Sequence, residues 1–361
     1  MGQELNKPNL NKNPKDGEDK FLRYGMNEIQ GWKKTMDVFS IKENSLGPNN
    51  NINIFGLFDG HSGKEISEYL SINFISELLK NNNFKNGDYK QALKDTFKNI
   101  DISLRTEEIN NKLLIISKQK EDRESQKINE IYKTIDNKNK LTKNEIDELN
   151  TFMDLINPNN LEGVFIADFI GSSGIIVLID DKITYIANAG NSHCIVINKN
   201  LGIINDKSII EQNVYNKKEK KRVFISKTIK YGKEKEKKFE NEEFLATRGF
   251  GNFQYKNNKL INIEEQEISP IPNIFEIENE QIKYLIICNS GFFEIAEIAN
   301  NVNKSIEKKI ADFFVNKLKT QKKISDIIGE YIDEFIPKNK ESMTNPFEYN
   351  LSCIIIDFIN N

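Results

Sequence analysis

The sequence is poor in cysteine, histidine, tryptophan and proline, and it has no long apolar run. Its 361 residues include 3 Cys, 2 His, 1 Trp and 8 Pro. Cys194, Cys288 and Cys353 lie in apolar, strand-like runs without the spacing of a metal site, which predicts buried free thiols in a reducing compartment. No apolar run approaches the roughly 20 residues of a membrane span, and the N-terminus has no apolar signal core. These absences favour a cytoplasmic protein.

Neither sign of charge is in large excess, because the net charge is only −3 while 29% of the residues are charged. Such a balance favours neither nucleic acid nor an anionic membrane as the main partner. Two basic runs, at 217–222 and 230–238, are the exceptions. They are typical of an exposed loop, and the alternative is a docking surface for an acidic partner.

Domain organisation follows from composition and hydrophobic spacing. Residues 1–20 are rich in Asn, Lys and Asp and contain little to bury, which predicts a mobile tail. Residues 21–361 are expected to form a single domain, because mixed α and β folds of this length often do so. Within it, about 116–161 changes to Lys, Glu, Asn and Asp, which indicates a solvated, charged insertion.

The most informative stretch is a strand that leads to Asp59. Residues 51–58 alternate and then turn wholly apolar, which predicts a strand entering the core. Helical spacing of apolar residues predicts a helix over 66–79. Asp59 would then lie in a glycine-rich turn between strand and helix. A carboxylate there, beside the main-chain carbonyl of Gly60, could bind a cation; the alternative is an ordinary turn residue or helix cap.

Several ordered motifs resemble the metal-dependent protein phosphatases of the 2C type. Residues 58–63, FDGHSG, are similar to the family's FDGHGG. Residues 30–37, QGWKKTMD, resemble its GWRxxMED motif, in a region where we expect a strand over 32–40. Further on, 187–193, ANAGNSH, resembles ANxGDSR, and 245–252, LATRGFGN, resembles LAVSRALGD.

This resemblance implies an α+β fold with two packed antiparallel β-sheets flanked by helices. Periodicity alone gives only the α+β class, from hairpins such as 174–187 and long helices such as 298–336. The resemblance also implies hydrolysis of phosphoserine and phosphothreonine by two Mg²⁺ or Mn²⁺ ions, which lower the pKa of a bridging water so that it attacks phosphorus.

Some site residues of the family are matched. By resemblance, Asp59 and the Gly60 carbonyl would bind metal, and Asp37 would do so in place of a glutamate that is one methylene longer. His61 matches the family's candidate general acid for the leaving alcohol. Lys33 replaces the arginine that grips phosphate, which exchanges a planar bidentate fork for a point charge.

Other positions of the family's metal site are replaced. Val38, Ser290 and Tyr349 stand where the family has acidic residues, and Asn191 and Asn252 replace two further aspartates. A tyrosine is neutral at pH 7, because its pKa is about 10. A register shift in the last strand could bring Glu348 inward as a substitute, but a one-residue slip would turn the strand's side chains to the wrong faces.

These replacements predict that Mg²⁺ or Mn²⁺ binds weakly or at one position only. In metal sites, loss of even an outer partner of a ligand costs about 10–100-fold in affinity or activity. The glycines and apolar strands of the scaffold are nevertheless kept. The sequence therefore favours a catalytically impaired pseudophosphatase that binds a protein or phosphoprotein partner in signalling. The alternative is an active serine/threonine phosphatase with a divergent metal site built on Asp59, Asp37 and His61.

Localisation and assembly are the least constrained. We expect a monomer, with nuclear or peripheral membrane association as alternatives to a cytoplasmic location. Gly2 could accept myristate, but Asn6 stands where that motif has Ser or Thr. A single acyl chain would in any case bind membranes only marginally.

Overall fold

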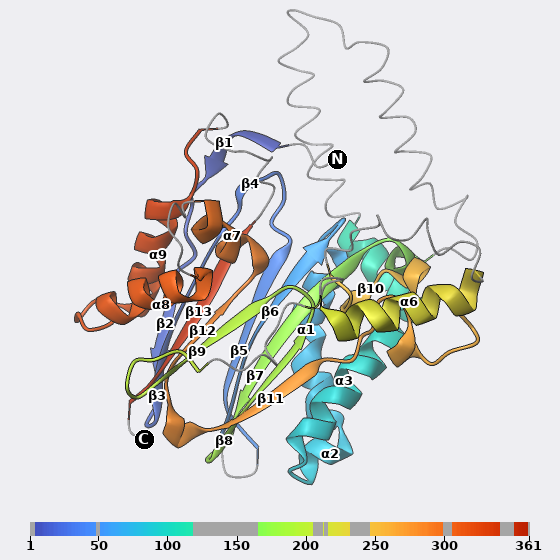
Figure 1. Cartoon of the computed structure of the whole chain (residues 1–361), viewed down its shortest axis with the longest axis horizontal. Coiled ribbons are helices and arrows are strands. Elements are labelled where there is room, and N and C mark those ends of the chain that lie inside the picture. Colours follow the sequence, from blue (N-terminus) through green and yellow to red (C-terminus); the bar gives the residue numbers. More distant parts are fainter. Residues whose placement is uncertain are drawn as a thin grey trace, which may run out of the picture.

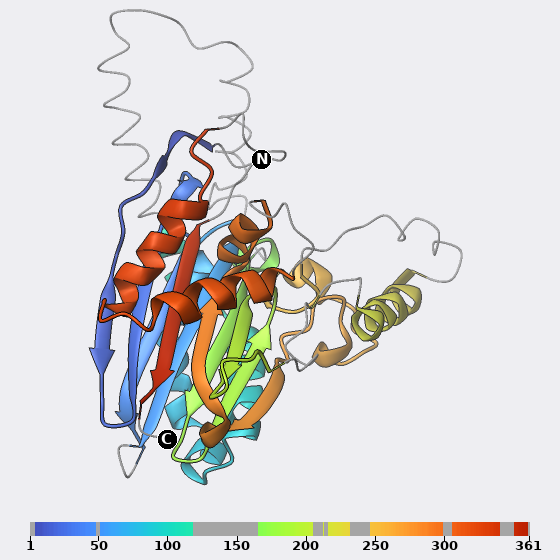
Figure 2. The ribbon, with the colours of Figure 1, turned by 60° about the vertical axis from the view of Figure 1, so that its left-hand side comes forward.

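Two antiparallel sheets pack face to face in the computed structural model of the chain (Figure 1). Helices cover the outer face of each sheet, as Figure 2 shows from the side. The predicted α+β architecture of two packed sheets flanked by helices is confirmed. The structure describes residues 4–47, 51–117, 165–204, 212, 216–231, 246–298, 305–339 and 350–359.

The first sheet carries Asp59 on its fourth strand along the main path. Neighbouring strands pair antiparallel, and short β10 (Phe250–Gly251) pairs with β7 at the side of this path. The path runs through β11 (Asn273–Glu278), β8 (Ile183–Ala189), β7 (Gly171–Ile179), β6 (Ile52–His61) and β5 (Val38–Leu46).

The second sheet joins the two ends of the chain, because the last strand lies between the third strand and the twelfth. Its order is β2 (Lys15–Glu18), β3 (Leu22–Ile29), β13 (Leu351–Phe358), β12 (Ile282–Cys288) and β9 (His193–Asn198). A separate two-stranded ladder pairs β1 (Glu4–Asn9) with β4 (Gly31–Lys33).

Side chains of each strand alternate between the inner and outer cores. In β6, Phe55 and Leu57 pack between the sheets, whereas Ile54 and Phe58 pack against the helices on the outer face. The period of two explains this, since successive strand residues point to opposite faces. Both faces of β6 are buried, so its sequence becomes continuously apolar.

Helices on the two outer faces come from different parts of the chain. The first sheet is covered by α1 (Glu65–Lys80), α2 (Asn82–Lys85) and α3 (Tyr89–Ser103), and residues 107–117 are also helical. The second is covered by α7 (Ser290–Ile298), α8 (Ile306–Lys317) and α9 (Ile324–Phe335). Helix α6 (Lys217–Tyr231) lies to one side of the two sheets. The short 3₁₀ helices among the described residues are η2 (Ile166–Asp168), η5 (Phe253–Tyr255), η6 (Ile263–Glu265) and η7 (Asn279–Gln281).

The expected tail at 1–20 contains strands in the structure. Besides the β1–β4 ladder, β2 pairs with β3, and Asp16 in β2 accepts hydrogen bonds from the main-chain N–H and the hydroxyl of Ser325. Ser325 lies in the first turn of α9, where main-chain N–H groups have no partner within the helix. A carboxylate is favoured there by the helix dipole. The mobile tail was predicted from composition alone, and composition does not reveal a partner as distant in the sequence as Ser325.

Two further expectations are corrected or left open. The strand expected over 32–40 is interrupted, because 34–37 forms a loop between β4 and β5. Most of the expected insertion at 116–161 lies outside the described residues. Among the helices that the structure describes, none is long and apolar enough to cross a bilayer.

A buried ion pair holds residues 249–256, which include β10 and η5, against α3. Lys256 Nζ lies 2.8 Å from Asp101 Oδ1 of α3, and both side chains are fully buried. The same carboxylate oxygen accepts from the main-chain N–H of Gly251, and Lys256 also donates to the carbonyl of Gly249. This cluster therefore ties β10 and the residue that follows η5 to α3.

We expect Asp101→Ala to lower the free energy of unfolding by about 3–5 kcal/mol, because it leaves the Lys256 ammonium buried without its counter-charge. Glu264→Ala is the matched control. It breaks the half-exposed pair of Glu264 with Lys98, on the same helix as Asp101 and one turn earlier, and should cost less than about 1 kcal/mol. Urea unfolding of both variants checks this, and equal losses would contradict it.

Candidate functional site

Asp59 lies inside a strand rather than in the turn that the sequence predicted. Strand β6 continues to His61 because β5 and β7 both extend to pair with it, with Asp59 opposite Val38 on one side and Ser173 on the other. The turn comes later, at Ser62, whose φ is 65°. The strand thus holds the Asp59 carboxylate at a buried position, 6% exposed.

Two neutral groups from the start of α7 contact this carboxylate. Asn289 Nδ2 donates to Asp59 Oδ2 at 3.2 Å, and Ser290 Oγ lies 3.4 Å from the same oxygen. Asn289 and Ser290 are both buried. Ser290 therefore lies beside Asp59, and its hydroxyl carries no charge.

Asp37 lies at the end of the 34–37 loop, and its carboxylate is paired with a lysine. Lys33 Nζ is 2.7 Å from Asp37 Oδ2, while the Asp37 side chain is only 4% exposed. The other oxygen, Asp37 Oδ1, is buried with no hydrogen-bond partner among the described residues. One oxygen of the carboxylate is thus neutralised by an ammonium, and the other is buried without a partner in the described part of the chain.

Main-chain hydrogen bonds place this loop against the rest of the site. The carbonyl of Asp37 accepts from the main-chain N–H of Gly60 at 2.9 Å and from the Ser67 hydroxyl at 2.7 Å. Its N–H donates to Asn350 Oδ1 at 2.7 Å. A side chain at Gly60 would meet the Gly63 carbonyl at 2.4 Å and the Asp37 carbonyl at 3.0 Å. Only glycine allows this close approach.

His61 is held by a chain of hydroxyl and amide groups. Its Nε2 lies 2.9 Å from Ser173 Oγ, and that hydroxyl donates to Asn191 Oδ1 at 2.6 Å. With the hydroxyl proton used in this way, His61 Nε2 is the donor to serine. Burial lowers the pKa of His61, although the nearby Asp59 carboxylate raises it. The imidazole is therefore predominantly neutral at pH 7.

The remaining predicted positions lie around this centre. Asn191 accepts the hydrogen bond of the Ser173 hydroxyl, which in turn contacts His61. The amide of Asn252 packs so closely against Gly171 that position 171 has no space for a side chain. Val38 is 1% exposed and pairs with Asp59. Tyr349 and the proposed substitute Glu348 lie outside the described residues.

The donor set of this site does not match a centre for two hard cations. Mg²⁺ and Mn²⁺ prefer several oxygen ligands, carboxylates above all. Asp59 and Asp37 are available, but Lys33 already pairs with Asp37, and Val38 and Ser290 bring no charge. In the described ranges, no group of three or more His, Cys, Asp or Glu side chains is placed to hold a metal ion.

Three positioning residues were not predicted: Asn289, Asn350 and Ser173. Each is buried and makes a hydrogen bond that reaches Asp59, Asp37 or His61. Asn289 and Asn350 directly neighbour predicted positions in the sequence. No sequence pattern marks a single buried amide, however, so only the three-dimensional contacts identify them.

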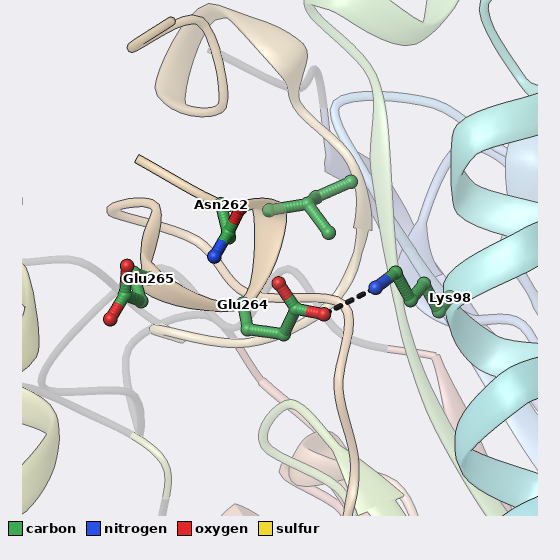
Figure 3. Close-up of a pocket in the computed structure, with 5 residues that line it drawn as sticks. Lys98, Asn262, Glu264 and Glu265 are labelled. Atoms are coloured by element: carbon green, nitrogen blue, oxygen red, sulfur yellow. Dashed lines mark hydrogen bonds and ion pairs between the residues drawn. The ribbon is translucent and has the colours of Figure 1, made fainter. Parts of the chain in front are cut away.

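A shallow hollow elsewhere on the molecule is not part of this site. Figure 3 shows it between α3 and η6, with the ion pair of Lys98 and Glu264 across it. It measures about 430 Å³ and is lined by Lys98, Asn262, Ile263, Glu264 and Glu265. None of the predicted site residues lines it.

Comparisons with known proteins agree with the motifs. The "Probable protein phosphatase 2C 4" of Paramecium tetraurelia is 26% identical over 93% of this chain and 91% of its own length. The "Probable protein phosphatase 2C 2" of the same organism is 28% identical over 81% of this chain and 80% of its own.

Similarity of structure extends over nearly the whole chain. A crystal structure of a phosphatase from Toxoplasma gondii aligns with a TM-score of 0.59 at 14% identity, covering 97% of this chain and 96% of its own. The family model described as Protein phosphatase 2C matches residues 22–122 and 107–325. These matches cover well over half of the sequence, and the chain therefore belongs to the protein phosphatase 2C family.

Proposed function

We propose that this protein is a pseudophosphatase, a member of its family that binds a protein or phosphoprotein partner with little or no turnover. The observation that supports this most directly is the Lys33 ammonium, which lies 2.7 Å from Asp37 Oδ2. It gives the Asp37 carboxylate a fixed counter-charge, which a metal ion would have to displace in order to bind there. Proteins of this family generally depend on Mg²⁺ or Mn²⁺ and act on phosphoproteins.

The charge balance of the site supports the same proposal. A two-metal centre brings four positive charges, and several carboxylates are needed to hold them. Here the carboxylates of Asp59 and Asp37 face one ammonium and two amide or hydroxyl groups, from Asn289 and Ser290. With so little negative charge, binding of the second metal ion, and with it formation of a metal-bound hydroxide, is disfavoured.

One observation favours the alternative, an active phosphatase that uses a single metal ion. Asp37 Oδ1 is buried without a hydrogen-bond partner in the described part of the chain. An unpartnered buried carboxylate oxygen is costly unless a ligand satisfies it. Asp59 and the Gly60 carbonyl are the residues that would complete such a site.

The two functions predict different results in a phosphatase assay. We expect hydrolysis of a phosphothreonine peptide to be as slow for the wild-type protein as for Asp59→Ala, in the presence of Mn²⁺ or Mg²⁺. The reason is that the wild type lacks the carboxylates that hold a second metal ion. Turnover by the wild type that is lost in Asp59→Ala would contradict the pseudophosphatase and support the alternative.

Metal affinity provides a second prediction that does not depend on turnover. In isothermal titration calorimetry, Val38→Asp combined with Ser290→Asp should raise Mn²⁺ affinity by at least about tenfold, because each change adds a carboxylate beside Asp59. Lys33→Met should also raise it, since it releases Asp37 Oδ2. Lys34→Met, an exposed neighbour with the same charge change, is the control and should have no effect.

Equal Mn²⁺ affinity in the wild type and in the Val38→Asp, Ser290→Asp variant would count against the argument from missing carboxylates. An effect of Lys34→Met as large as that of Lys33→Met would show that only net charge matters. In that case the Lys33–Asp37 pair would have no specific role.

A further inference from the structure

Helix α6 presents an unusual pair of faces. Its inner face carries charged groups, whereas its solvent face carries two large apolar side chains, Phe224 and Ile225, which are 48% and 45% exposed. An amphipathic surface helix normally has the opposite arrangement. The helix stands to one side of both sheets, as Figure 2 shows.

A buried ion network holds the inner face in place. Glu219, 3% exposed, lies 2.7 Å from Arg222 Nη2 and 2.7 Å from Arg248 Nη2. Burial by itself raises the pKa of Glu219, but the two guanidinium groups outweigh this and hold the pKa at about 2. Arg222 also donates to the carbonyl of Thr247 at 2.6 Å. These contacts fix which face of α6 points outward.

The outer face combines positive charge with the apolar pair. At 3.6 residues per turn, its exposed side chains fall within an arc of about 160°. Among the described side chains of α6, at 217–227, the one carboxylate is Glu219, which points inward, and no ion pair is recorded for the outer lysines. We call this set the α6 face: Lys217, Lys218, Lys220, Lys221, Phe224 and Ile225.

We propose that the α6 face is a docking site for an acidic segment of a partner protein that carries at least one large apolar residue. Charge complementarity supports this occupant, because four exposed lysines concentrate positive charge on a chain whose net charge is −3. Phe224 and Ile225 provide the apolar contact. The inference rests on the proposed function, since it names the surface by which a binding protein would recognise its partner.

An anionic membrane is the other surface that attracts basic and apolar side chains. Helices that lie in a membrane interface bury a whole apolar face by about 5–10 Å. Among the side chains of α6 that the structure describes, at 217–227, the large exposed apolar ones are Phe224 and Ile225, and the opposite face is fixed by Glu219 and its arginines. The acidic protein segment is therefore the better fit.

Fluorescence anisotropy with the full-length protein tests this docking site. The probe is a fluorescein-labelled synthetic peptide with a leucine and a phenylalanine among glutamates and no phosphate. We expect binding that weakens as salt rises. Phe224→Ala with Ile225→Ala should weaken it at least about tenfold. The matched control is Ile72→Ala with Ile102→Ala, which removes two exposed isoleucines from α1 and α3 and should leave binding unchanged.

The charged part of the α6 face is tested in the same assay. Lys220→Glu with Lys221→Glu should abolish peptide binding, whereas Lys182→Glu with Lys319→Glu, an equal charge change at exposed lysines elsewhere, should weaken it far less. All four substituted lysines are exposed, so folding should be preserved, and thermal melting checks this.

Three results would overturn the docking site. The first is no peptide binding by the wild type, the second is unchanged binding in the α6 variants, and the third is binding only to phosphatidylserine vesicles. Failure of the proposed function is recognised separately, because it would appear as wild-type turnover of the phosphothreonine peptide. Either proposal can therefore fail while the other stands.

Discussion

The site depends on two buried amides, Asn289 and Asn350, that join the two sheets beside Asp59 and Asp37. Asn289 accepts from the main-chain N–H groups of Ser352 and Phe292, and donates to Asp59 and to the carbonyl of Asn350. Asn350 in turn accepts from Asp37 N–H and donates to two carbonyls of the β3–β5 connection. Asn289 thus makes all four hydrogen bonds that an amide side chain can form, and Asn350 makes three. Neutral groups therefore contact the Asp59 carboxylate and hold the main chain at Asp37.

Lys33 supplies Asp37 with a counter-ion from within the chain. A metal ion exchanges with solvent and brings a bound water of lowered pKa, whereas the ammonium of Lys33 brings neither. It does provide charge compensation, so that the buried carboxylate of Asp37 retains a counter-ion. His61 is neutral and bonded to Ser173, a state suited to holding a position rather than to delivering a proton.

The sequence predicted the fold well for those strands and helices whose apolar residues recur with a regular period. The sheet core, including β6, β12 and β13, follows from alternation and apolar runs. The strands before Leu22 could not be predicted, because they depend on the distant partners Ser325 and Lys33. At the site, motif spacing located Asp59, Asp37 and Ser290. It could not show that Lys33 turns onto Asp37, since a loop, unlike a helix, gives residues four apart no fixed relation.

A continuous set of hydrogen bonds links α6 to the candidate site. Thr247 Oγ1 lies 2.8 Å from Glu219 Oε2 and 2.8 Å from the carbonyl of Gln212. The Gln212 side chain accepts from Gly190 N–H at 2.6 Å, next to Asn191, which bonds to the Ser173 hydroxyl beside His61. Buried polar groups of this kind are costly to leave unsatisfied. Any displacement of α6 would therefore have to break or re-form bonds that reach His61, so α6 and the candidate site are coupled through this set of bonds.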